Sequence, residues 1–159
     1  MNGQTKETKE WRGMLSTEIE VLKRQGCTAG DWQSIRVSPG FVPTHIYNTH
    51  FSGEICLGRF NHTFLLDGGL VKQAGLYNVT LHNCIIGDDV LIENVHNYIA
   101  NYEIKDRCFI QNVDLIITEG MSSFGNGTLV SVMNESGGRE VPIFNTLSAH
   151  LAYIIALYR

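Results

Sequence analysis

The sequence predicts an all-β core built as a short parallel β-helix of six-residue repeats, with an N-terminal helix and a C-terminal apolar helix. A helix repeats every 3.6 residues and an alternating strand every two, so neither explains the spacing found here, whereas a coil with three flat sides of six residues does. A large apolar residue recurs at every sixth position: Ile86, Ile92, Tyr98, Ile104, Ile110 and Ile116. Residues 82–99 also match residues 100–117 at seven positions: Asn83/Asn101, Ile86/Ile104, Asp88/Asp106, Ile92/Ile110, Asn94/Asn112, Val95/Val113 and Ile99/Ile117.

In such a coil, each side is a short strand that pairs with the same side of the next coil, roughly 4.8 Å away. Every sixth residue is expected to point inward and to stack on its equivalents. The corners need tight turns, often with a left-handed backbone that Asn tolerates. We therefore expect corner ladders in which Asn83 lies over Asn101 and Asn94 lies over Asn112.

The chain divides into four expected segments. Residues 1–45 form an N-terminal tail and helical cap, with a helix over 15–25 that is capped by Ser16 or Thr17. Residues 46–118 form the parallel β-helix, with an excursion at about 59–75 between two similar stretches, 46–58 and 76–87. Residues 119–144 form a loop rich in Gly, Ser and Asn, or a loose hairpin. Residues 145–159 form a helix capped by Asn145 or Ser148.

The C-terminal helix is apolar around most of its circumference, so we expect it to be buried, either on the prism or against another chain. A chain that stops inside such a helix is expected to be a fragment of a longer protein or a subunit of an oligomer.

Composition limits the classes of function. The chain has 159 residues and a formal net charge of -4, which suggests one globular domain. No stripe of Lys and Arg appears, which disfavours a nucleic-acid partner. No signal peptide and no long apolar run is found, so we expect a cytoplasmic protein without a membrane span. The four cysteines form no C-x-x-C pair, so we expect reduced thiols and no metal site.

The segment His82, Asn83, Cys84, Ile85, Ile86, Gly87, Asp88 resembles the signature of left-handed β-helix acyltransferases, in the sialic-acid and bacillosamine acetyltransferase group. The resemblance covers residues 46–120 and is specific over these seven residues. It implies that the β-helix is left-handed, that His82 is the general base, and that acetyl-CoA binds as a substrate along the prism edge between subunits of a homotrimer. A sugar or nucleotide-sugar would be the acceptor. Asn83 stands where some relatives have a carboxylate.

The flanking segments are also similar to an uncharacterised family of longer bacterial proteins. The shared stretches are "QGCTA.DW", "SSFGNG" and "GREVPIF". Some of those proteins are loosely described as sugar-phosphate nucleotidyltransferases, because such enzymes also carry this β-helix.

The candidate site residues have plain structural alternatives. His82 is the candidate base, with Asn83 beside it, or it is a packed corner histidine. His96 and Asp114 are eighteen residues apart, so we expect Asp114 directly above His96, either orienting the ring at a substrate site or lying on the surface. His50 has a similar status. Arg139 follows "SSFGNG" (122–127), which is either an anion cradle or a plain turn.

Three functions are compatible with these patterns. The first is a CoA-dependent acyltransferase that acts on a sugar or nucleotide-sugar with His82 as base. The second is a non-catalytic β-helix that serves as an oligomerisation or regulatory module of a larger sugar-phosphate nucleotidyltransferase-like protein. The third is a structural scaffold. An acyltransferase should bind CoA beside His82, whereas a module should assemble into trimers and bind nothing there.

Overall fold

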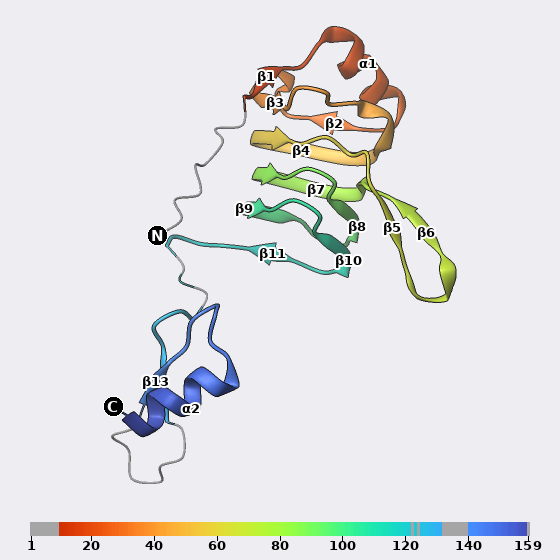
Figure 1. The fold of residues 1–159 in the computed structure, drawn as a ribbon. Helices are drawn as coiled ribbons and strands as arrows, with labels where there is room; N and C mark the ends of the chain where they lie inside the picture. The colour runs from red at the N-terminus through yellow and green to blue at the C-terminus, as the bar shows by residue number, and fades with distance from the viewer. Residues whose placement is uncertain (1–9, 122, 124, 132–139, 159) are drawn as a thin grey trace. The chain divides into compact units, whose positions relative to one another are not determined.

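The chain is mostly β-sheet, with two α-helices. We describe a computed structural model that places residues 10–121, 123, 125–131 and 140–158 (Figure 1). The chain separates into two compact units, residues 1–118 and residues 119–159. The prediction of an all-β core is confirmed by a nine-stranded sheet in the first unit.

The first unit is a stack of coils in which parallel strands lie one above the next. The two longest strands, β4 (Ile46–Leu57) and β7 (Gly75–Ile86), pair along most of their length. β7 then pairs with both β8 (Leu91–Val95) and β9 (Ile99–Ile104). The last coil contains β10 (Phe109–Val113) on β8 and β11 (Ile116–Ile117) on β9. Each coil therefore lies on the coil that precedes it in the sequence.

The sheet begins earlier than residue 46, where the sequence placed its start. β2 (Thr28–Ala29) and β3 (Ile35–Val37) both pair in parallel with β4, and β1 (Arg12–Gly13) pairs antiparallel with β3. These strands are two or three residues long and are separated by a short 3-10 helix, Trp32–Ser34. A strand that short carries too few side chains to repeat a recognisable pattern.

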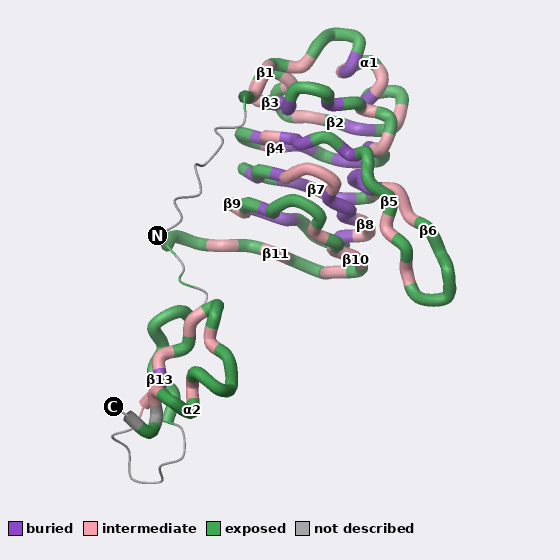
Figure 2. The backbone as a smooth tube through the Cα atoms, viewed as in Figure 1, coloured by how far each residue is buried: buried purple, intermediate pink, exposed green. Residues whose placement is uncertain are grey.

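Apolar side chains form columns inside the stack. The register places Leu81 beneath Phe51 and above Ile99, and places Ile86 between Leu57 and Ile104. All of these side chains are at most 5% exposed. Figure 2 shows the buried residues along the coils of β4, β7, β8 and β9, with fewer on β11. The interior is thus a continuous core that positions the outward-facing residues of each strand.

Tyr98 is the exception to the predicted six-residue ladder. Its side chain is 38% exposed, and Ile99 is the residue that is fully buried. Residue 76 of β7 pairs with residue 92 of β8, and residue 81 of β7 pairs with residue 99 of β9. The sequence separation is two residues larger in the second pair than in the first. Two extra residues therefore fall between β8 and β9. They widen the corner at 96–98 and turn Tyr98 outward.

The corner ladders are confirmed. Among the residues that the structure describes, eight other than glycine have a positive φ, and six of these are asparagines: Asn48, Asn78, Asn83, Asn94, Asn101 and Asn112. The Asn48 amide donates a hydrogen bond to the Asn78 carbonyl at 2.9 Å, and Asn78 donates to Asn94 at 2.9 Å. Asn83 donates to Asn101 at 3.4 Å. The amides therefore link successive coils at the two corners.

The excursion at 59–75 contains an antiparallel hairpin, β5 (Thr63–Leu65) and β6 (Val71–Gln73), joined by a turn at Asp67–Gly69. It projects from the stack in Figure 1. The base of the hairpin is fixed by the Asp89 carboxylate, which accepts hydrogen bonds from the backbone N–H groups of Asn61 and His62. An ion pair between Lys72 and Glu93 adds a second attachment to the stack.

The first helix, α1 (Ser16–Arg24), lies at the first end of the stack, where its Leu22 is fully buried in the core. The N-cap is Leu15 and not the predicted Ser16 or Thr17. The Glu18 carboxylate accepts the Leu15 backbone N–H at 2.8 Å and a guanidinium N–H of Arg12 at 2.9 Å. Glu18 thus satisfies the backbone N–H of the N-cap residue and also holds the preceding segment against the helix.

Replacing Glu18 with glutamine is expected to lower the free energy of unfolding by about 1 to 2 kcal/mol near neutral pH. The hydrogen bond from Arg12 holds the pKa of Glu18 below its ordinary value in the folded chain. The ionised carboxylate therefore stabilises the fold above the ordinary pKa of glutamate. This contribution is lost as the pH falls through the lower, folded-state pKa. Urea denaturation of both proteins at neutral and at strongly acidic pH measures the difference, which should shrink in acid.

The control for this experiment is Glu20→Gln, which removes an exposed carboxylate from the same helix. A gap between Glu18→Gln and wild type that stays the same at both pH values would contradict the ionic contribution.

The second unit contains the hairpin β12 (Leu129–Ser131) and β13 (Glu140–Pro142), followed by helix α2 (Ala149–Tyr158). The Ser148 hydroxyl accepts the backbone N–H of Leu151 at 3.2 Å, which confirms one of the two predicted caps. α2 was expected to be buried on the prism or against another chain, and in the single chain its Leu151, Tyr153, Ile154 and Leu157 are between 37% and 53% exposed. Within its own unit the helix has too few neighbours to cover these side chains.

Candidate functional site

The outward face of one side of the stack carries the candidate site. Along β4 and β7, the inward residues Phe51 and Leu81 alternate with outward residues, because successive strand residues point to opposite faces. Two hollows lie on this outward face. The His82 groove has a volume of about 400 Å³ and is lined by His50, Ser52, Thr80, His82, Tyr98, Ala100, Asn101 and Ile117.

The second hollow, the asparagine groove, has a volume of about 250 Å³. It is lined by Gly26, Thr28, Asn48, Thr49, His50, Asn78, Val79, Thr80, Val95, His96 and Asn97. His50 and Thr80 line both grooves, so the two hollows are neighbours on the same face. The widened corner at 96–98 contributes to both, with His96 and Asn97 in the asparagine groove and Tyr98 in the His82 groove.

His82 is exposed, and both of its ring nitrogens have partners. Nδ1 lies 2.9 Å from the Ser52 hydroxyl oxygen, and Nε2 lies 3.1 Å from the amide nitrogen of Asn83. Ser52 and His82 are register partners on adjacent strands, so the coil stacking brings them together. The ring is thus held from one neighbouring coil and from its own strand.

The bonds of Asn83 fix the proton on the His82 ring. The Asn83 Oδ1 atom accepts the backbone N–H of Glu54 at 3.0 Å, so Nδ2 is the atom that faces the imidazole. Because Nδ2 can only donate, Nε2 of His82 must accept. In the neutral ring the proton then lies on Nδ1 and is donated to the Ser52 oxygen. The arrangement leaves the basic lone pair of His82 on Nε2 and leaves Ser52 unactivated as a nucleophile.

Gly53 makes this arrangement possible. β4 has a bulge between Ser52 and Ile55, and Gly53 has a φ of 66° there. A Cβ atom at Gly53 would lie 2.0 Å from the Asn83 Oδ1 atom. A glycine is therefore needed for the Asn83 amide to reach the Glu54 backbone.

The Asp114 carboxylate does not orient the His96 ring as expected. His96 lines the asparagine groove with an exposed side chain, but the Asp114 carboxylate accepts a hydrogen bond from the Asn97 amide at 2.9 Å. The backbone keeps the register of β8 and β10 up to this point, since the His96 N–H donates to the Val113 carbonyl and the Asn97 N–H donates to the Asp114 carbonyl. Asp114 thus fixes Asn97 and leaves His96 alone.

Arg139 lies outside the described residues, so its role as an anion contact stays a prediction. Within "SSFGNG", residues 125–127 form a turn: the Asn126 N–H donates to the Ser123 carbonyl at 3.0 Å, and Thr128 donates to Gly125 at 3.0 Å. These bonds use the backbone in the way a plain turn does. Residues 122 and 124 are not described.

Ser52, Thr28 and Tyr98 were not predicted as site residues from the sequence. The similarity between 46–58 and 76–87 contains the signal for Ser52, because the offset that aligns Tyr47 with Tyr77 also aligns Ser52 with His82. No such signal exists for Thr28, whose hydroxyl lies 2.8 Å from Nδ1 of His50.

The buried thiols offer no nucleophile to this site. Cys27 and Cys84 are buried, and burial raises the pKa of each above its ordinary value. A thiol with a raised pKa is a poor source of thiolate. Among residues 10–121, 123, 125–131 and 140–158, no group of three or more His, Cys, Asp or Glu side chains is placed to hold a metal ion.

Comparison with known families gives one match. The family model described as a domain of unknown function, DUF4954, matches residues 11–159. The chain belongs to this family. No curated protein matches the chain, and no solved structure matches it. In the described part of the chain, neither helix has the length and apolar character needed to cross a bilayer.

Proposed function

We propose that this DUF4954 chain forms a left-handed parallel β-helix of the hexapeptide-repeat class and acts as a CoA-dependent acyltransferase on a sugar or nucleotide-sugar. His82 is the general base in this proposal, acetyl-CoA is the acyl donor, and the working form is a cytoplasmic homotrimer. The observation that carries the proposal is the His82 imidazole. It is exposed in a groove, its orientation is fixed by Ser52 and Asn83, and its lone pair is on Nε2.

The chemistry follows from that ring. An acceptor hydroxyl or amine replaces the Asn83 amide as the donor to Nε2, and its oxygen or nitrogen attacks the thioester carbonyl. Nε2 takes the proton as the new bond forms. When the C–S bond breaks, the imidazolium gives this proton to the departing thiolate. The hydrogen bond from Nδ1–H to the Ser52 oxygen is kept throughout, and it stabilises the positively charged ring.

The second candidate function is the non-catalytic module of a larger sugar-phosphate nucleotidyltransferase-like protein. Asn83 favours it, because each polar atom of its amide is already used within the stack: Oδ1 by Glu54, and Nδ2 by His82 and Asn101.

Binding of the acyl donor separates the two functions. We expect saturating acetyl-CoA or free CoA to raise the melting temperature, because a ligand at 100 times its Kd stabilises a fold by about 2.7 kcal/mol. His82→Ala should keep this shift, since a base acts on the acceptor and not on the donor. The matched control is His62→Ala, an exposed histidine that lines neither groove. If neither ligand shifts the wild type, the acyltransferase proposal fails and the module is favoured.

A further inference from the structure

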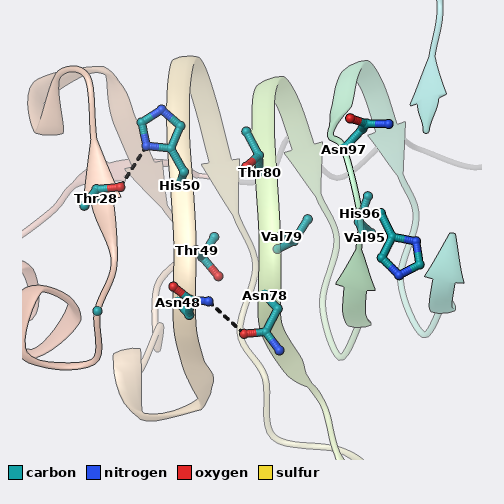
Figure 3. A pocket seen from close by; sticks show the side chains of 11 residues that line it. Thr28, Asn48, Thr49, His50, Asn78, Val79, Thr80, Val95, His96 and Asn97 are labelled. Carbon is teal, nitrogen blue, oxygen red and sulfur yellow. Dashed lines mark hydrogen bonds between the residues drawn. The ribbon is translucent and has the colours of Figure 1, made fainter. Parts of the chain in front are cut away.

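The asparagine groove contains no strongly charged side chain. None of the residues that line it is Asp, Glu, Lys or Arg. Its polar groups are amides, hydroxyls and imidazoles, contributed by β2, β4, β7 and the corner after β8. Figure 3 shows Thr28, His50, Thr80 and Asn97 along one border, with Asn48 and Asn78 along the other. Such a lining supplies no permanently charged side chain to neutralise a phosphate, a carboxylate or a metal ion.

Several of these polar groups are held in place by bonds to each other. Asn48 and Asn78 are joined at 2.9 Å, with the left-handed backbone at both positions turning the amides to the corner. Thr28 holds Nδ1 of His50 at 2.8 Å, which leaves Nε2 of that ring for a ligand. Asp114 holds Asn97 at 2.9 Å. The groove is therefore pre-organised before any ligand arrives.

Other groups keep their hydrogen-bonding capacity. Within the described part of the chain, neither the Thr80 hydroxyl nor the His96 ring has a hydrogen-bond partner, and the Asn48 Oδ1 atom also has none. A hydroxyl both donates and accepts hydrogen bonds, and an amide oxygen accepts them. A neutral imidazole donates through one nitrogen and accepts through the other. This mixture suits a ligand whose own groups donate and accept at closely spaced positions.

We propose that the asparagine groove binds one neutral sugar ring. The hydroxyls of a sugar ring are closely spaced, uncharged, and able both to donate and to accept. The volume of about 250 Å³ lies below that of pockets for larger organic ligands, which start at about 300 Å³. The inference deepens the proposed function and rests on it for one point: the shared residues His50 and Thr80 direct a ring hydroxyl towards His82.

Ligand-observed NMR titration of the full chain tests the groove. The neutral probes are glucose and N-acetylglucosamine, and the charged probes are glucose 6-phosphate and inorganic phosphate. We expect at least one neutral sugar to bind and inorganic phosphate not to bind. Thr80→Val keeps the shape of the side chain and removes its hydroxyl, so it should weaken sugar binding about three- to tenfold.

Two further variants keep the test independent of folding. Thr63→Val makes the same change on β5, away from both grooves, and should leave binding unchanged. Asn48→Gly removes an amide at a position where glycine tolerates the positive φ, and should also weaken binding. Failure of both neutral sugars to bind, tighter binding of inorganic phosphate, or equal affinity in Thr80→Val and wild type would overturn the inference.

Failure of the sugar-binding inference is distinguishable from failure of the proposed acyltransferase function. Sugar binding that Thr80→Val weakens, without any response to acetyl-CoA, would retain the sugar site and reject the acyltransferase. Conversely, acyl transfer whose KM for the acceptor is the same in Thr80→Val and wild type would retain the enzyme and reject the asparagine groove as the place where the sugar ring binds.

Discussion

Replacing Phe51 with alanine is expected to lower the free energy of unfolding by about 3 to 5 kcal/mol. Phe51 is 1% exposed and lies in the middle of β4, where the register places it between Ala29 of β2 and Leu81 of β7. Its ring also meets Trp32 edge-on, with centroids 6.4 Å apart. Three successive coils therefore lose packing atoms at once, and a rigid stack has little freedom to close the cavity.

The measurement is urea denaturation followed by circular dichroism. The matched control is Tyr47→Ala, which removes another aromatic ring from the same strand. Tyr47 is 44% exposed, and its ring stacks on Tyr77 with centroids 5.9 Å apart. Its loss should cost about 0.5 to 1.5 kcal/mol. Equal losses in the two variants would show that the column through Phe51 is not the centre of the core.

Under the proposed acyl-transfer function, replacing His82 with glutamine is expected to lower kcat by about 10² to 10⁴, the usual contribution of a general base. Glutamine retains polar contact with Ser52 but has no basic lone pair to take the acceptor proton. The KM for acetyl-CoA should change little, because binding of the acyl donor does not depend on the base. Steady-state kinetics with a neutral amino sugar as acceptor measures both constants.

His62→Gln is the control for the kinetic experiment, since it makes the same exchange at a histidine near the base of the β5–β6 hairpin. Its kcat should equal that of the wild type. A His82→Gln protein with wild-type kcat would remove His82 from the chemistry, even if the chain still binds acetyl-CoA.

The repeat was predictable from the sequence wherever corners recur at constant spacing. Asn83 and Asn101 are separated by eighteen residues in the sequence, and the structure joins their amides at 3.4 Å. Corner asparagines are strong markers because few residues adopt the left-handed backbone without strain. The first coil was missed because β2 and β3 are too short to repeat a pattern, although they pair in the same parallel way.

The site was predictable only in part, for a related reason. His82 and Asn83 were found from a contiguous segment. The eighteen-residue spacing of His96 and Asp114 did not reveal that the Asp114 carboxylate bonds to the Asn97 amide instead of the His96 ring. The corner at 96–98 has two residues more than its counterpart on β7, so residues beyond it are displaced relative to that coil. These two residues move Tyr98 from the core to the groove. Periodicity alone does not reveal where such an insertion lies.

The pairing of each coil with its sequence neighbours affects how the first unit folds. Strand partners are separated by a few tens of residues at most. The coils can therefore form one after another, without the closure of long loops. Opening would then begin at the ends of the stack, and backbone amides there would exchange with solvent first. His82 is on β7, which lies between β4 and β9 and therefore away from both ends of the stack. The imidazole and its partners therefore stay assembled during fluctuations that unravel only the last coil.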